Sequence, residues 1–242
     1  SALVDERATP PAAVPASHRF SETLDEVIDR RTAFLTEYQD ADYAARYAAA
    51  VGRVRQTEAA NCSEETALAD TVARALFKLM AYKDEYEVAR LYTETDFLQR
   101  VADRFEGRYE LNFHLAPPLL AKRDPESGHL RKQTYGPWML AAFRLLAKLR
   151  RVRGTPFDIF GHTQERRTER RLIGEYEAVL DEITTRLSPS NHATAVELAA
   201  FPLEIRGFGH IKQASLARAK AKEASLLAQF RSASPAHALA AE

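Results

Sequence analysis

The chain has 242 residues, of which 45% are hydrophobic and 28% are charged. This is ordinary globular composition, and it excludes a wholly disordered chain. Lys and Arg total 34 and Asp and Glu total 34, so the formal net charge is 0 and there is no global attraction to nucleic acid or to an anionic membrane.

The cysteine count and the hydropathy of the chain exclude further classes of protein. Cys62 is the only cysteine, so this chain alone makes no internal disulfide and no cysteine-rich metal site. No apolar run approaches the length needed to span a bilayer, and the N-terminus lacks the regions of a signal peptide. We therefore expect a cytoplasmic protein that binds neither membrane nor nucleic acid.

Helical periodicity dominates the first eighty residues. Residues 1–20 are rich in Ala and Pro without a sustained period, which is typical of a linker or an arm. Ser21 and Ser63 are suitable N-caps, and apolar residues recur at helical spacing after each of them. Helices are predicted over about 21–38, 41–58 and 63–80.

The segment LFKLMAYKDEYEVARLY, residues 76–92, interrupts its own apolar face. If it is one helix, three charged residues fall on the face that begins with its leucines: Lys83, Glu87 and Arg90. Either the helix breaks near Lys83 and leaves residues 83–85 in water, or the three charges form a buried ion-pair network or domain interface. The sequence leaves both alternatives open.

The pattern changes to a period of two in the middle of the chain. A helix over about 95–105 ends at Gly107, and apolar residues then alternate with polar ones over 108–115, as in a half-buried strand. The run DPESG at 124–128 has turn chemistry, so a small antiparallel sheet is predicted at about residues 108–135.

Further helices follow the predicted sheet. An amphipathic helix is predicted to start at Pro137. Its apolar face is formed by Trp138, Ala142, Leu145, Leu146 and Leu149. Trp138 and Phe157 are interpreted as core anchors. Helices are expected over about 163–187, 190–200 and 210–231. The predicted fold is mainly α: a single multi-helix domain at 21–231 with a small antiparallel β-sheet, then a flexible tail at 232–242.

Candidate sites are few. The chain has no HExxH, no GxSxG, no P-loop and no full GxGxxG, so neither a metal site nor a catalytic residue is predicted. Lys148, Arg150, Arg151 and Arg153 are interpreted as a solvated basic cluster at a helix end. Near the last helix, an anion site is a candidate, although a structural turn explains the same residues: Arg206, Gly207, Gly209 and His210.

Several blocks together resemble one enzyme family. LFKLMAYKDEYEVARLY, FHLAPPLLAKRDPESG, YGPWM, RGTPFDIFG and EIRGFGHIKQASLARAKAKEASLL are similar, in this order, to the C-terminal region of fused indolepyruvate ferredoxin oxidoreductases. These thiamine-diphosphate-dependent enzymes oxidatively decarboxylate arylpyruvates to acyl-coenzyme A and pass electrons to ferredoxin. The resemblance implies that the complete enzyme contains thiamine diphosphate, Mg and iron–sulfur clusters. It also implies that the complete enzyme is a homo-oligomer.

This chain lacks the parts that carry such chemistry. One cysteine cannot ligate a Cys₄ cluster, and the Gly-Asp-Gly stretch that binds magnesium diphosphate is missing. No cofactor is therefore expected on this chain, and its partners are expected to be upstream catalytic domains or a catalytic subunit. The leading hypothesis is a non-catalytic structural and assembly domain. The alternative is a regulatory domain of the same enzyme that binds coenzyme A or another anion.

Overall fold

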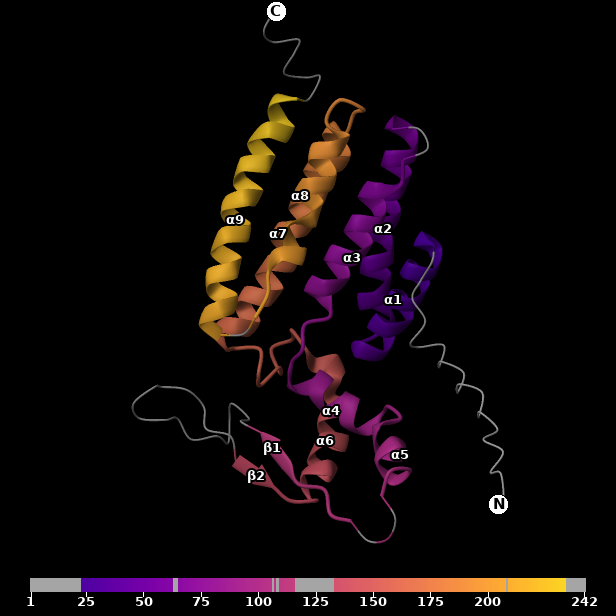
Figure 1. The fold of residues 1–242 in the computed structure, drawn as a ribbon, viewed down its shortest axis with the longest axis vertical. Coiled ribbons are helices and arrows are strands. Elements are labelled where there is room, and N and C mark those ends of the chain that lie inside the picture. Colours follow the sequence, from indigo (N-terminus) through magenta and orange to yellow (C-terminus); the bar gives the residue numbers. More distant parts are fainter. Residues whose placement is uncertain are drawn as a thin grey trace, which may run out of the picture.

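The computed structural model describes residues 23–62, 65–105, 107, 109–115, 133–207 and 209–233. Within them, long helices form a bundle, and a smaller group of helices with a two-stranded sheet lies at one end of it (Figure 1). The prediction of a mainly α fold with a small antiparallel sheet is confirmed. The predicted arm at 1–20 and the tail from 234 onward lie outside the described residues.

The bundle contains the longer helices, which enclose the larger of two hydrophobic cores. Buried tyrosines of the bundle donate hydrogen bonds from their hydroxyls to backbone carbonyls. Tyr47 donates to the carbonyl of Ala73 at 3.0 Å, and Tyr176 donates to that of Ala199 at 2.8 Å. These bonds tie neighbouring helices together inside the apolar core. The bundle helices are α1 (Leu24–Tyr38), α2 (Ala41–Asn61), α3 (Ala67–Met80), α7 (Gln164–Arg186), α8 (His192–Glu204) and α9 (Gly209–Ser232).

The smaller group, which we call the end module, has a core of its own. Tyr92 stacks on Phe143 with ring centroids 5.2 Å apart, and Phe113 meets both rings edge-on. Strand β1 (Phe113–Leu115) pairs antiparallel with β2 (Gln133–Tyr135), and Phe113 lies opposite Tyr135. The module's helices are α4 (Glu85–Thr93), α5 (Phe97–Ala102), α6 (Met139–Lys148) and the 3₁₀ turn η2 (Leu149–Val152).

Some predicted boundaries differ from the structure. Within the described residues, the strand predicted over 108–115 is paired only from Phe113, and the predicted turn at 124–128 lies outside them. Helix α2 continues to Asn61 rather than 58 because Cys62, the residue after it, still donates its backbone N–H to Glu58.

Helix α6 is apolar on two sides, and the sequence predicted the buried one only in part: Ala142 and Leu146 of the predicted face are partly buried against the core of the end module. Met139, Phe143 and Ala147 face α4 and are buried. Trp138 and Leu145 are 59% and 62% exposed, and Phe157 in the following loop is 80% exposed. The prediction that Trp138 and Phe157 anchor the core is therefore wrong. Since α6 packs mainly on α4 within the described chain, only one of its two apolar sides is covered.

A buried carboxylate joins three helices of the bundle. Glu58 near the end of α2 is 1% exposed and accepts the free backbone N–H groups of Leu68 and Ala69, at 2.8 Å each, in the first turn of α3. Its Oε1 also lies 2.7 Å from Nε2 of His192 in α8. Glu58 thus acts as an N-cap supplied from another helix.

Replacing Glu58 by Ala should lower the free energy of unfolding by about 2–4 kcal/mol, because two buried N–H groups of α3 lose their acceptor. Urea unfolding followed by circular dichroism measures this change. Glu65→Ala, which removes an exposed carboxylate nearby, is the control and should change the stability by less than about 0.5 kcal/mol. Equal losses in the two variants would contradict the capping role.

Candidate functional site

The helix interruption predicted near Lys83 is present, between α3 and α4. Helix α3 ends at Met80 and α4 begins at Glu85. Asp84 caps α4, because its Oδ1 accepts the backbone N–H of Glu87 at 2.8 Å. The connection of residues 81–84 therefore leaves the bundle and starts the end module.

Asp84 is also half of a deeply buried ion pair. The Arg153 guanidinium donates to both of its carboxylate oxygens, from Nε at 2.5 Å and from Nη2 at 2.9 Å, and the two side chains are 2% and 3% exposed. Arg153 also donates to the carbonyl of Tyr38 at 2.6 Å and lies over its ring. Burial opposes the charged guanidinium, but the bonds to Asp84 outweigh it, and the pKa of Arg153 is raised.

Glu87 and Arg90 form a second buried pair on α4. Arg90 donates to the Glu87 carboxylate at 2.8 and 2.9 Å, and both side chains are at most 5% exposed. A third bond, 3.0 Å long, runs from Arg90 to Glu37 of α1, whose side chain is 68% exposed. Both open alternatives for this segment thus hold in part. The helix breaks, but of residues 83–85 only Lys83 is exposed, and two of the three residues of the predicted network are buried as a pair.

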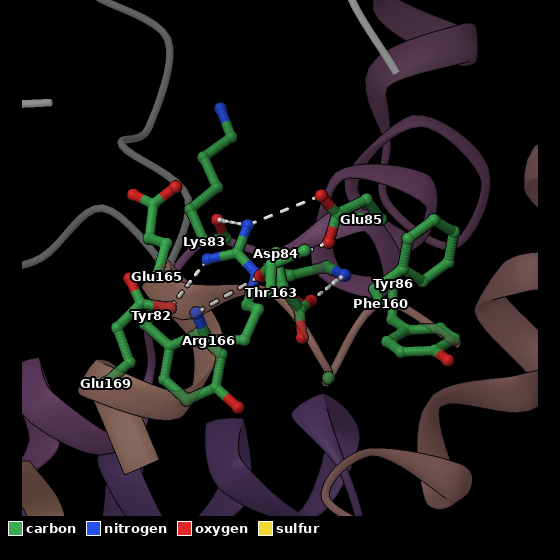
Figure 2. Close-up of polar contacts among 12 residues, drawn as sticks. Tyr82, Lys83, Asp84, Glu85, Tyr86, Phe160, Thr163, Glu165, Arg166 and Glu169 are labelled. Atoms are coloured by element: carbon green, nitrogen blue, oxygen red, sulfur yellow. Dashed lines mark hydrogen bonds and ion pairs between the residues drawn. The ribbon is translucent and has the colours of Figure 1, made fainter. Parts of the chain in front are cut away.

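Lys83 does not belong to the buried network. Figure 2 shows its side chain directed away from the neighbouring ion pairs, and the residue is exposed. The hydrogen bond that joins it to the cluster uses its backbone carbonyl, 3.4 Å from Nη2 of Arg166. An unpaired ammonium is stable there only in water, so including Lys83 in the network was wrong.

Arg166, in the first turn of α7, binds the start of α4 to the bundle (Figure 2). It donates to Glu169 at 2.6 Å and lies 3.4 Å from Glu85, with its own side chain 12% exposed. Burial, as the largest effect, raises the pKa of Glu85, although the charge of Arg166 opposes that shift.

Asp158 shapes the loop between η2 and α7. Its carboxylate is 4% exposed and accepts three backbone N–H groups, from Gly154 at 2.8 Å, Phe160 at 3.2 Å and Gly161 at 2.9 Å. It also accepts the hydroxyl of Tyr86 in α4, at 3.2 Å. Burial and then Asp158 raise the pKa of Tyr86. The loop that carries Arg153 is thereby held against α4.

We call this set the ion-pair joint: Asp84–Arg153, Glu87–Arg90, Glu85–Arg166 and Asp158. It lies where the end module meets the bundle. Each of its three guanidiniums is paired with a carboxylate of the set, and Asp158 is paired with Arg170 at 3.6 Å. The sequence identified Glu87 and Arg90 but missed Asp84, Asp158, Arg153 and Arg166, which come from three separate segments. Arg153 had been assigned to a solvated basic cluster, and its burial corrects that assignment for this residue; Lys148 and Arg151 are exposed.

The predicted anion site is only partly assembled. Arg206 is exposed, Gly207 and Gly209 have φ values of 90° and 53°, and the side chain of His210 lies outside the described parts. Gly207 lines a cavity of about 360 Å³ between α3, α7 and the turn from α8 to α9, whereas Arg206 and Gly209 are not among its described lining residues. Lys78 and Lys212, which the sequence analysis did not single out, line it instead.

Two possible kinds of chemistry receive no support from the described residues. No three His, Cys, Asp or Glu side chains gather there as a metal-binding group. Cys62 is buried, and burial followed by the charge of Glu58 raises the pKa of its thiol, which makes the reactive thiolate less available.

The fold and site define a helical domain whose two hydrophobic cores are connected by buried ion pairs. A protein-family model matches residues 24–225, and the chain belongs to that family, described as a family of unknown function, DUF6537. No curated protein and no solved structure matches the chain. None of the helices in the described part is both long and apolar enough to cross a membrane.

Glu87→Ala should lower the free energy of unfolding by about 3–5 kcal/mol, because Arg90 would stay buried without its main partner. Glu37→Ala removes the other carboxylate that binds Arg90, but this carboxylate is 68% exposed, so a loss of at most about 1 kcal/mol is expected. Urea unfolding of both variants compares the two partners of one guanidinium. A loss under 1 kcal/mol in Glu87→Ala would show that the pair is accessible to water.

Two substitutions at Asp84 separate its roles. Asp84→Asn keeps an oxygen to cap α4 but removes the charge that faces Arg153, so a loss of about 3 kcal/mol is expected. Asp84→Ala also removes the cap and should cost about 1 kcal/mol more. Adding Arg153→Met to Asp84→Asn should recover part of the loss, because no buried charge is then unpaired.

Chemical denaturation of these three variants and of Arg153→Met alone tests this ordering. Asp96→Asn is the control, since it disrupts a pair with Arg100 in which both side chains are more than half exposed. If Arg153→Met lowers the free energy of unfolding as much in the Asp84→Asn background as it does alone, the two residues are not coupled.

Proposed function

We propose that this chain is a non-catalytic structural and assembly module of a 2-oxoacid:ferredoxin oxidoreductase of the indolepyruvate type. Its partner is the catalytic part of that enzyme, present as upstream domains or as a separate subunit. Thiamine diphosphate, Mg and the iron–sulfur clusters belong to that part, and ferredoxin accepts its electrons. The blocks that resemble the family support this assignment, and the complete assembly is expected in the cytoplasm as a homo-oligomer.

The observation that carries the proposal is the uncovered apolar side of α6. Trp138 directly precedes α6 and Leu149 is the first residue of η2, which continues α6 without a break. At intervals of seven and four residues, Trp138, Leu145 and Leu149 lie on one side of this helical segment. They are 59%, 62% and 41% exposed. Large apolar side chains aligned in this way favour contact with another protein, and tryptophan is enriched at such interfaces. We call these three residues the α6 stripe.

The ion-pair joint supports the same role in a different way. Its carboxylates and guanidiniums bind one another, so it offers no free base or nucleophile for a reaction. What it does provide is a fixed orientation of α6 relative to the bundle, since bidentate pairs are directional. A rigid module that presents an apolar stripe is suited to assembly rather than to catalysis.

The α6 stripe should bind the catalytic part of an indolepyruvate ferredoxin oxidoreductase produced without its own C-terminal region. Trp138 is the only tryptophan, so 5-fluorotryptophan labelling gives this chain one ¹⁹F resonance. That resonance should shift or broaden when the catalytic part is added, because binding moves the ring out of water. With arylpyruvate, coenzyme A and a viologen, the chain alone should show no turnover.

Leu145→Asp should weaken this binding at least about tenfold, because a carboxylate would be buried in an apolar contact. Arg144→Asp is the matched control, since it introduces the same side chain at the neighbouring exposed position and should leave binding nearly unchanged. An unchanged ¹⁹F resonance, or equal weakening by the two variants, would contradict docking through the α6 stripe. So would a homodimer of the chain alone formed through that stripe.

A further inference from the structure

The cavity between α3, α7 and the turn from α8 to α9 has the size of a small-molecule site. Its volume is about 360 Å³, within the range common for ligand pockets. Apolar side chains from several elements form much of its wall: Leu79, Tyr82, Leu172, Pro202 and Ile205. Such a wall is suited to the body of an organic ligand rather than to a bare ion.

The charged lining of this cavity is unbalanced. Among the described lining residues, four are cationic, Lys78, Lys83, Arg166 and Lys212, against two carboxylates, Glu165 and Glu169. Both carboxylates are already engaged: Lys212 lies 2.5 Å from Glu169 and 4.0 Å from Glu165, and Arg166 lies 2.6 Å from Glu169. Glu85, outside the lining, also pairs with Arg166 at 3.4 Å. The remaining positive charge has no carboxylate to neutralise it among the described lining residues.

Lys78 and Lys83 are the uncommitted cations. No described carboxylate pairs with either, and Lys78 donates one hydrogen bond, to the carbonyl of Leu203 at 2.8 Å. Burial, and then the positive charges of Arg206 and Lys212, lower the pKa of the Lys78 ammonium. Cations that repel one another in this way are stabilised together by an anion placed among them.

A second cavity, of about 230 Å³, is also lined by cations but is less suitable. Its arginines are Arg46, Arg153 and Arg170. Arg46 binds Glu177, Arg153 binds Asp84, and Arg170 donates to the carbonyl of Gly161. Nη1 of Arg170 has no hydrogen-bond partner among the described residues, but it lies 3.6 Å from the Asp158 carboxylate. Each of the three arginines thus already has a carboxylate partner, and the second cavity has no unpaired cation among its described lining residues.

We propose that the larger cavity binds a small organic anion, with a carboxylate or phosphate head held by Lys78 and Lys83 and an apolar body against Leu79, Leu172 and Ile205. Of the residues in the sequence-based anion hypothesis, Gly207 lines this cavity, and the proposed site adds residues of α3 and the 81–84 connection. It does not depend on the assembly role, because the α6 stripe lies in the end module and contributes nothing to the cavity.

Calorimetry on the full chain at about 0.15 M salt, where long-range charge effects are screened, tests the site with four probes. Phenylacetate and phenyl phosphate carry both the apolar body and an anionic head. Benzyl alcohol lacks the charge, and inorganic phosphate lacks the body. At least one aryl anion should bind about tenfold or more tightly than both partial probes, and the better of the two identifies the head group.

Paired charge variants locate the binding. Lys78→Gln with Lys83→Gln should weaken the aryl anion at least about tenfold, because both uncommitted cations are lost. Lys148→Gln with Lys222→Gln removes the same charge from exposed positions outside the cavity lining and should leave affinity within about twofold. All four lysines are exposed, and circular dichroism checks that both variants fold.

Three results would overturn the site. The first is no binding of either aryl anion by the unmodified chain. The second is inorganic phosphate or benzyl alcohol binding as tightly as the aryl anions, which would remove the need for the apolar wall or for the cations. The third is equal weakening of aryl anion binding by the two paired variants. This would show that affinity depends on the net charge of the chain and not on the positions of Lys78 and Lys83.

Discussion

The structure depends on the pairing of Asp84 with Arg153 between its two hydrophobic cores. Both side chains are almost fully buried, and a buried charge without a partner costs several kcal/mol. Asp84 begins α4, and Arg153 also binds the last residue of α1 through its carbonyl. One pair thus fixes the start of the end module, the loop after α6 and the end of α1. Apolar packing alone is less directional and would leave their orientation less sharply defined.

Such a joint contributes geometry more than stability. Well-packed apolar residues in place of a buried ion pair are often as stable or more so, whereas removing one partner is costly. The bidentate bonds of Arg90 to Glu87 and of Arg153 to Asp84 restrict direction as well as distance. A domain whose role is to present α6 at a set angle benefits from that restriction, and this connects the joint with the proposed assembly role.

Local periodicity in the sequence predicted most of the fold, but it could not identify residues that pair across long distances in the chain. Apolar residues at helical spacing identified the bundle helices, and the charges that interrupt the face of residues 76–92 identified Glu87 and Arg90. Arg153 pairs with a residue 69 positions away, and a basic run at a helix end gives no sign of that partner. Trp138 was misplaced because α6 is apolar on two sides, and only packing decides which side is covered.

The joint and the larger cavity share side chains. Arg166 lines the cavity and also lies 3.4 Å from Glu85, the first residue of α4. Tyr82 lines the cavity from the connection that leads into Asp84. Glu85 and Glu169 already bind the Arg166 guanidinium, so this side chain forms a wall between the joint and the cavity rather than a free cation. The same pairing that holds α4 against the bundle therefore leaves Lys78 and Lys83 as the lining cations without a described carboxylate partner.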